Sequence, residues 1–212
     1  MFVFDCDGVV LNSNEIKNNA FRLALAGCPQ AEVDAFLAMH RATAGVSRFA
    51  KFEWMANRAR ERGYPFDYAE ALEQYAETCR TKLLASDIAP GLSKARENCD
   101  EVWAIVSGGD QEEVREVLER KGVAHYFDGG IYGSPRNKIE LLSELKKSHD
   151  LASSIFFGDS AYDHDSAIQF KMTFHFVWGW TEMAEWNDYC ASRSSVSAVH
   201  RYVTDYFGQS LS

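Results

Sequence analysis

The chain has 212 residues, of which 46% are hydrophobic and 13% aromatic, and it carries a formal net charge of −9 at pH 7. This composition predicts a soluble globular protein with one full core and room for a smaller second domain. No stretch approaches the ~20 apolar residues of a membrane span, and no signal-peptide pattern is present. The dispersed negative charge disfavours non-specific nucleic-acid binding, which depends on clustered Lys and Arg. We therefore expect a cytoplasmic protein with neither a membrane nor a nucleic-acid partner. The sequence leaves the oligomeric state open.

The first ten residues combine a short apolar run with two acids. Residues 2–4 (Phe-Val-Phe) are typical of a buried strand, and Asp5 and Asp7 follow at once, with Gly8 behind them. Ligands of open α/β sheets bind at the carboxyl ends of the strands, so acids placed there are candidates for chemistry. Two neighbouring buried carboxylates need a cation or a shared proton. A solvated acidic turn is the alternative that these residues leave open.

Residues 12–85 predict helices without a convincing strand. The segment Asn12-Ser-Asn-Glu15 has the spacing of a helix start capped by Asn12, and this helix should end near Gly27. Apolar stripes at helical spacing indicate three more helices that pack as a bundle. Their members are Val33, Phe36 and Leu37; Phe49, Phe52, Met55, Ala56 and Ala59; and Tyr68, Ala71, Leu72, Tyr75, Ala76 and Cys79.

Beyond Pro90-Gly91 the sequence alternates between strands and helices. Strands are expected at 102–106, around 131–132, at 155–157 and at 174–177, with helices at 111–121, 138–147 and 164–170 between them. This alternation predicts an α/β protein with a doubly wound parallel sheet. The helical block is then an insertion after the first strand. At the end of the chain, Val199, Tyr202, Val203 and Tyr206 suggest a last helix.

Polar residues follow several of the predicted strands and should meet in one crevice at the sheet edge. Such a set suits phosphoryl transfer, because a phosphate monoester needs a cation and fixed donors around its oxygens. Carboxylates from two strands would hold Mg²⁺, while a serine, the next helix N-terminus and a lysine would bind the phosphate. The candidates are Asp5 and Asp7, Ser107 and Gly108, Lys138, and Asp159 and Asp163.

Each of these candidates also has a simpler structural interpretation. Asp159, Asp163 or Ser107 could cap a helix N-terminus, where acids and hydroxyls are favoured. Lys138 could be a solvated helix residue, with Arg136 nearby as a substitute cation.

The sequence resembles the haloacid dehalogenase-like hydrolase superfamily over nearly its whole length. The four motifs of that superfamily occur in order, and the first and last are the most specific. They are Asp5-Cys-Asp-Gly-Val-Val10, Ile105-Val-Ser-Gly108, the lysine of Ser134-Pro-Arg-Asn-Lys138, and Phe157-Gly-Asp-Ser-Ala-Tyr-Asp163. The resemblance implies a Rossmann-like core domain at 1–12 and 88–212 and an inserted helical cap domain at 13–87.

The resemblance also implies a role for each motif. Asp5 would be the nucleophile that forms an aspartyl-phosphate, and Asp7 would act as general acid and base in an environment that favours its protonated form. Mg²⁺ would be held by Asp5, the backbone carbonyl of Asp7, Asp159 and Asp163, the last directly or indirectly. Ser107, Gly108 and Lys138 would bind the phosphate.

Substrate choice is expected to lie in the cap. Residues 45–48 (Gly-Val-Ser-Arg) resemble the substrate-contacting cap loop of the phosphoglycolate phosphatase and β-phosphoglucomutase-like branch, where Arg48 would contact a carboxylate or second phosphate. A surface arginine is the alternative. Lys17 is a second cap candidate. It occupies a position where many relatives have histidine, and Asn12 occupies one where many have aspartate. Both departures weaken the transfer of a specific substrate from those relatives.

These observations favour a Mg²⁺-dependent phosphatase for a small phosphorylated metabolite, such as a sugar phosphate or a phosphoglycolate-like acid. A sugar phosphomutase of the β-phosphoglucomutase type is the alternative, since it shares the aspartyl-phosphate. A binding protein on an inactive scaffold is disfavoured, because such a protein should lack a catalytic acid and all are present here.

Overall fold

The computed structural model describes residues 1–209 and contains a six-stranded sheet in which all neighbouring strands are parallel. The strand order is β3-β2-β1-β4-β5-β6. The predicted α/β doubly wound sheet is therefore confirmed. The strands are β1 (Phe2–Phe4), β2 (Trp103–Asp110), β3 (Ile131–Ser134), β4 (Ile155–Gly158), β5 (Thr173–Val177) and β6 (Val196–His200).

Helices cover both faces of the sheet, because alternate side chains of each buried strand point to opposite sides. Phe4 belongs to one apolar cluster and Val3 to the other. The Phe4 face is covered by α5 (Leu92–Glu97), α6 (Gln111–Arg120) and α10 (Asp205–Gln209). The Val3 face is covered by α7 (Lys138–Leu145), α8 (Ala161–Gln169) and α9 (Trp186–Ala191). Short 3₁₀ turns occupy Leu83–Ala85, Ala124–Tyr126 and Leu151–Ser153.

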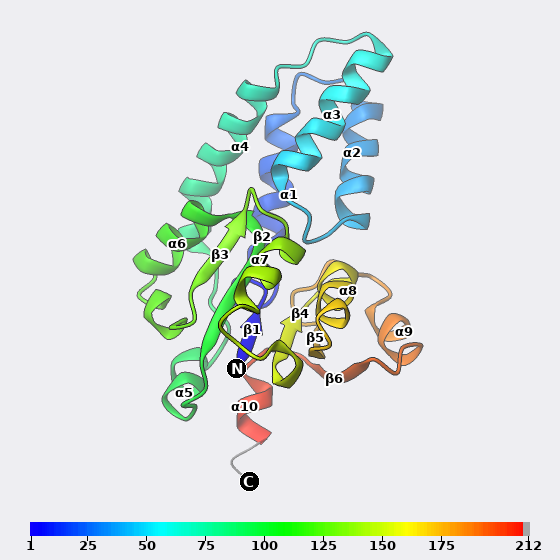
Figure 1. The fold of residues 1–212 in the computed structure, drawn as a ribbon. Helices are drawn as coiled ribbons and strands as arrows, with labels where there is room; N and C mark the ends of the chain where they lie inside the picture. The colour runs from blue at the N-terminus through cyan, green and yellow to red at the C-terminus, as the bar shows by residue number, and fades with distance from the viewer. Residues whose placement is uncertain (210–212) are drawn as a thin grey trace.

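Four helices form the block between β1 and the rest of the sheet, and Figure 1 shows them gathered beyond the ends of the strands. They are α1 (Asn14–Ala24), α2 (Gln30–Ala42), α3 (Arg48–Arg62) and α4 (Tyr68–Lys82), and we call them the helical insert. Their aromatic side chains pack around Phe21, whose ring centroid lies 5.1 Å from that of Phe36 and 4.3 Å from that of Tyr75. The expected bundle is confirmed. Tyr68 is an exception, being 36% exposed at the start of α4 before the first buried residue.

Three local expectations were wrong. Helix α1 has Ser13 rather than Asn12 at its N-cap, and the Ser13 hydroxyl donates to Asp7 instead of capping. Strand β2 continues to Asp110, four residues beyond the predicted end at Val106. The tail contains a sixth strand, so Val199 lies in β6 and only Tyr206 lies in the last helix. The strand was missed because its alternate residues are exposed at the sheet edge, which weakens its apolar pattern.

No helix in residues 1–209 has both the length and the apolar character needed to cross a membrane.

Truncation of the Phe4 side chain, which lies in the core of the sheet, should strongly destabilise the protein. This ring is fully buried, with centroids 4.9 Å from Trp103, 5.2 Å from Phe157 and 5.8 Å from Phe127. Phe4→Ala should lower the free energy of unfolding by about 3–5 kcal/mol, measured by urea denaturation. Leu23→Ala, at a residue that is 55% exposed, should change it by less than about 0.5 kcal/mol. Equal costs for the two variants would contradict this packing.

Candidate active site

The strand order places the site at the point where the sheet changes direction. The chain passes from β1 outward to β2 and β3, then returns to β4 on the other side of β1. A crevice forms at such a switch point, outside the carboxyl ends of the strands. Asp5 follows β1 and Asp159 follows β4, and the Asp5 backbone N–H donates to the Phe157 carbonyl at 2.9 Å. The two acids are therefore neighbours on the central strands.

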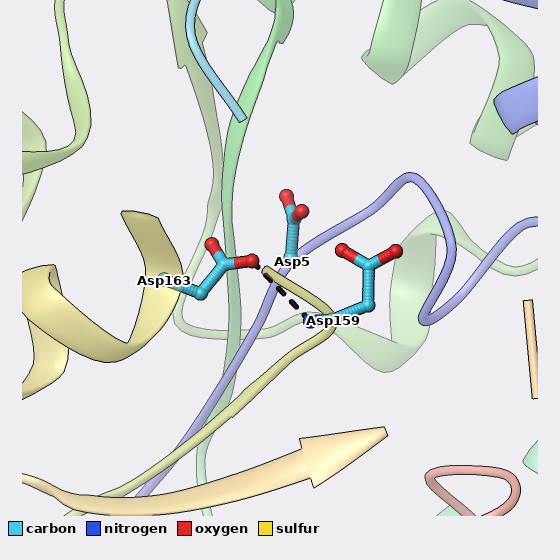
Figure 2. Close-up of side chains that lie close together, drawn as sticks. All are labelled: Asp5, Asp159 and Asp163. Atoms are coloured by element: carbon cyan, nitrogen blue, oxygen red, sulfur yellow. Dashed lines mark hydrogen bonds between the residues drawn. The ribbon is translucent and has the colours of Figure 1, made fainter. Parts of the chain in front are cut away.

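Three carboxylates meet in this crevice, as Figure 2 shows for Asp5, Asp159 and Asp163. One oxygen of each lies within 4.8 Å of the others, and the three residues are 3%, 7% and 0% exposed. Asp163 reaches the cluster from the first turn of α8, where it accepts from the Asp159 backbone N–H at 3.3 Å and from the Ser160 hydroxyl at 2.6 Å. The structure thus brings together three of the predicted acids.

Lys138 is the cation within this acidic cluster. Its buried Nζ lies 2.8 Å from Asp5 Oδ1 and also pairs with Asp163. Lys138 begins α7, whose start is fixed by reciprocal hydrogen bonds between Asn137 and Glu140. Burial opposes the charge of Lys138, but the two carboxylates outweigh that effect and raise its pKa. The solvated alternative for Lys138 is therefore excluded.

One ammonium does not balance three buried carboxylates. Burial is the main cause that raises the pKa of Asp5, with further contributions from Asp163 and Asp7 against the opposing effect of Lys138. Burial, then Asp163 and Asp5, raise the pKa of Asp159. The surplus negative charge and the all-oxygen donor set fit a hard divalent cation. Gly8 lets the backbone approach the Asp159 carboxylate closely, because a Cβ at this position would overlap that carboxylate. Its φ of +78° also favours glycine.

The Asp7 carboxylate lies outside this cluster and faces the helical insert. Its Oδ2 accepts from Lys17 at 2.5 Å and its Oδ1 from the Ser13 hydroxyl at 2.5 Å. Burial raises the pKa of Asp7, but Lys17 and Ser13 together more than offset this effect, so the pKa is lowered. The expected environment favouring protonated Asp7 is therefore not found in this arrangement, because the insert supplies an ammonium at the carboxylate.

Ser107 and Gly108 lie within β2, on the strand beside Asp5. The Ser107 hydroxyl is buried and accepts from the Gly109 backbone N–H at 2.9 Å. Asp110 caps α6 by accepting from the Glu113 N–H at 3.1 Å, so Ser107 is not the helix cap. A Cβ on Gly108 would overlap the backbone carbonyl of Gly45. The core and the loop before α3 therefore approach closely at this glycine.

A cavity of about 470 Å³ lies between the acidic cluster and the helical insert. Both cap candidates line it, and both already have partners. Lys17 binds Asp7, whereas Arg48 Nη1 lies 2.8 Å from Glu113 and Nη2 lies 3.6 Å from Asp110. Arg48 is 9% exposed, so it is not a surface arginine. Its ion pairs join the insert to α6 across one wall of the cavity.

Sequence reasoning missed the residues that hold Asp159 in place. Asn14 Nδ2 donates to Asp159 Oδ2 at 3.2 Å and to the Trp180 carbonyl at 2.9 Å, and the Thr181 hydroxyl donates to the Asp159 carbonyl at 2.6 Å. Thr181 follows the end of β5, so the rule that polar residues after strands line the crevice could have found it. Asn14 gave no such signal, because it resembles an ordinary helix-start residue.

The crowded carboxylates predict that a divalent cation stabilises the protein. Mg²⁺ at about 100 times its dissociation constant should add about 2.7 kcal/mol to the free energy of unfolding, seen as a rise in Tm. Asp159→Asn removes one ligand and should abolish most of that rise. Asp100→Asn makes the same chemical change at an exposed residue and should retain it. An undiminished rise in Asp159→Asn would contradict the proposed ligand set.

Comparison with known proteins places this geometry in a family. A model of the haloacid dehalogenase-like hydrolases matches residues 1–171, whereas no curated protein matches the chain. A "predicted phosphoglycolate phosphatase" from Haemophilus somnus has a similar structure, with TM-score 0.76, 16% identity, and coverage of 99% of this chain and 97% of that one. So does a haloacid dehalogenase-like family protein from Streptococcus pneumoniae, with TM-score 0.69, 19% identity, and coverage of 98% and 96%. These similar structures show that the fold is shared. The match to the family model shows that the chain belongs to the haloacid dehalogenase-like hydrolases.

Proposed function

We propose that the protein is a Mg²⁺-dependent phosphatase of small phosphorylated metabolites, with the core at 1–12 and 88–212 and the helical insert at 13–87 acting as its cap. The observation that carries this proposal is the convergence of Asp5, Asp159, Asp163 and Lys138 beside a cavity of about 470 Å³. The cavity suits one small ligand. The name of the Haemophilus somnus protein supports the same reaction class.

Asp5 is the proposed nucleophile. Its carboxylate attacks phosphorus, the bond from phosphorus to the ester oxygen breaks, and the leaving alcohol takes a proton. Water then attacks the aspartyl-phosphate, which restores the Asp5 carboxylate and releases inorganic phosphate. Lys138, 2.8 Å from Asp5 Oδ1, holds the nucleophile and offsets phosphate charge. Mg²⁺ bound by Asp5, Asp159, Asp163 and the Asp7 carbonyl would supply positive charge for the phosphate oxygens.

Asp7 is the proposed proton carrier, and Lys17 controls its charge. The contact with Lys17 favours the carboxylate, which is the form that takes a proton from the attacking water. Donation to the leaving alcohol requires the protonated form, so the contact between Asp7 and Lys17 must lengthen for that step. Ser107 and the N–H groups around Gly108 would bind phosphate oxygens on the other side of Asp5.

The mutase alternative is less well supported. A sugar phosphomutase must hold a second phosphate, and the cap arginine expected to do so is neutralised by Glu113 and Asp110. The inactive-scaffold alternative is disfavoured because the four acids of the first and last motifs are present and three of them converge.

Loss of the nucleophile tests the proposed chemistry. Asp5→Asn should lower phosphate release from a panel of phosphorylated metabolites by about 10⁴-fold or more, and a chelator should abolish release in the unsubstituted protein. Asp100→Asn is the matched control and should retain activity. Full activity in Asp5→Asn or in chelator would contradict the mechanism. Movement of phosphate within a hexose without release would favour the mutase.

Removal of Lys17 should change the pH profile in a defined direction. Lys17 lowers the pKa of Asp7, so Lys17→Met should raise it. The proton-donating form then survives to higher pH, and the limb of the kcat/KM profile governed by Asp7 moves upward. Lys82→Met removes an exposed lysine of α4 and should leave the profile unchanged. An unmoved or downward-shifted limb in Lys17→Met would show that Lys17 does not control Asp7.

A further inference from the structure

The insert side of the cavity contains a buried lysine that no motif identified. Lys51 on α3 is 4% exposed and lines the cavity together with His40 of α2. Its Nζ lies 2.6 Å from His40 Nδ1, and its ammonium also lies 5.9 Å from the centroid of the Phe21 ring. Within residues 1–209, Lys51 forms no ion pair with a carboxylate. Lys17, Arg48 and Lys138 differ, because all three have acidic partners. Arg41 also lines the cavity and forms no ion pair within residues 1–209, but it is exposed to solvent, whereas Lys51 is buried.

A buried ammonium without a counter-charge is costly. Burial, followed by repulsion from Lys17, lowers the pKa of Lys51 to about 7, although Glu182 and Asp7 act in the opposite direction. Glu182 forms no ion pair with Lys51, and its Oε1 accepts a hydrogen bond from Asn18. The cavity wall thus contains a cation whose charge is stabilised when an anion enters.

His40 orients this lysine. An ammonium has only donors, so His40 Nδ1 accepts and the ring proton of the neutral form lies on Nε2. Burial, then repulsion from Lys51, Lys17 and Arg41, lower the pKa of His40 to about 3, so the ring stays neutral. His40 Nε2 has no hydrogen-bond partner among the described residues, and Glu182 Oε2 lies 3.9 Å away. His40 therefore adds no charge to this part of the cavity wall, and its Nδ1 fixes the direction of the Lys51 ammonium.

We propose that Lys51 binds a carboxylate at the end of the substrate remote from the transferred phosphate, with His40 as its positioning residue. The inference rests on the proposed phosphatase function for the other end of the same molecule. It narrows the substrate class to small phosphate monoesters of carboxylic acids. A carboxylate fits better than a second phosphate, because the buried pair of Lys51 and neutral His40 offers one positive charge and Glu182 lies beside this pair.

Binding of two matched esters tests this subsite. The esters 3-phosphoglycerate and glycerol 3-phosphate share a phosphate and a three-carbon chain and differ in a carboxylate against a hydroxymethyl group. Their affinities for Asp5→Asn, measured by calorimetry with Mg²⁺, should favour 3-phosphoglycerate by about tenfold or more. When Lys51→Met is added to Asp5→Asn, the ratio of the two affinities should fall to about one. When Lys51→Arg is added instead, the preference for the carboxylate should remain. Lys82→Met is the matched control and should leave the ratio unchanged.

The ratio should also depend on pH in a direction that the structure fixes. The pKa of Lys51 is about 7 in the free protein, so its charge is lost as the pH rises from 6 to 8, and the preference for 3-phosphoglycerate should fall over that range. Lys51→Arg introduces a side chain that stays charged over this range, so it should remove the pH dependence. The groups facing Lys51 and His40 are Lys17, Arg41, Glu182 and Asp7. Both esters meet these groups and carry the same phosphate. Titration of these groups or of the phosphate therefore affects both affinities alike and largely cancels in their ratio.

The outcomes separate this inference from the proposed function. A Lys51-dependent preference supports the subsite even where the unsubstituted protein releases no phosphate, a result that would overturn the phosphatase proposal alone. Phosphate release with equal affinity for both esters, or binding of neither, would overturn the subsite. Tighter Lys51-dependent binding of propane-1,3-diol bisphosphate than of 3-phosphoglycerate would overturn the assignment to a carboxylate.

Discussion

The site depends on the burial of one lysine between two carboxylates, at the carboxyl ends of the central strands of a parallel sheet. Lys138 contacts Asp5, which follows β1, and Asp163 of α8, and a third acid, Asp159, completes the cluster. Removing one partner from such a group leaves an uncompensated buried charge, which is far more costly than the loss of an exposed pair. The surplus negative charge explains why the cluster suits a divalent cation. Under the proposed function, such a cation would in turn make the site suitable for a phosphate dianion.

The helical insert is electrostatically tied to the core around the cavity. Lys17 binds Asp7, Arg48 binds Glu113, and Asn18 binds Glu182, so each contact joins the insert to a residue outside it. Lys51 is different, because its only hydrogen-bond partner among the described residues is His40 within the insert. The insert therefore combines contacts that hold it against the core with a buried cation, Lys51, that has no acidic partner among the described residues. In this account the core determines the reaction and the insert determines the substrate.

Much of the fold and the acidic cluster could be predicted from the sequence, because both follow from local patterns. The apolar run before Asp5 and the alternation of strands and helices determine which acids meet at one edge. The cation that pairs with Asp7 and the carboxylates that pair with Arg48 could not be predicted, because these contacts depend on how the insert lies against the core. Lys51 was missed for the same reason. It lies among the apolar residues of the stripe through Phe52 and Met55, and only the fold shows that it faces the cavity.

The stereochemical course at phosphorus tests the central claim, that Asp5 forms a covalent intermediate, most directly. A phosphate monoester made chiral with oxygen isotopes would be hydrolysed in water of a distinct isotope, and the configuration of the released phosphate determined by NMR. Attack by Asp5 followed by attack of water inverts phosphorus twice, so this account predicts overall retention. Overall inversion would show that water attacks the substrate directly and would contradict the assignment of Asp5 as nucleophile.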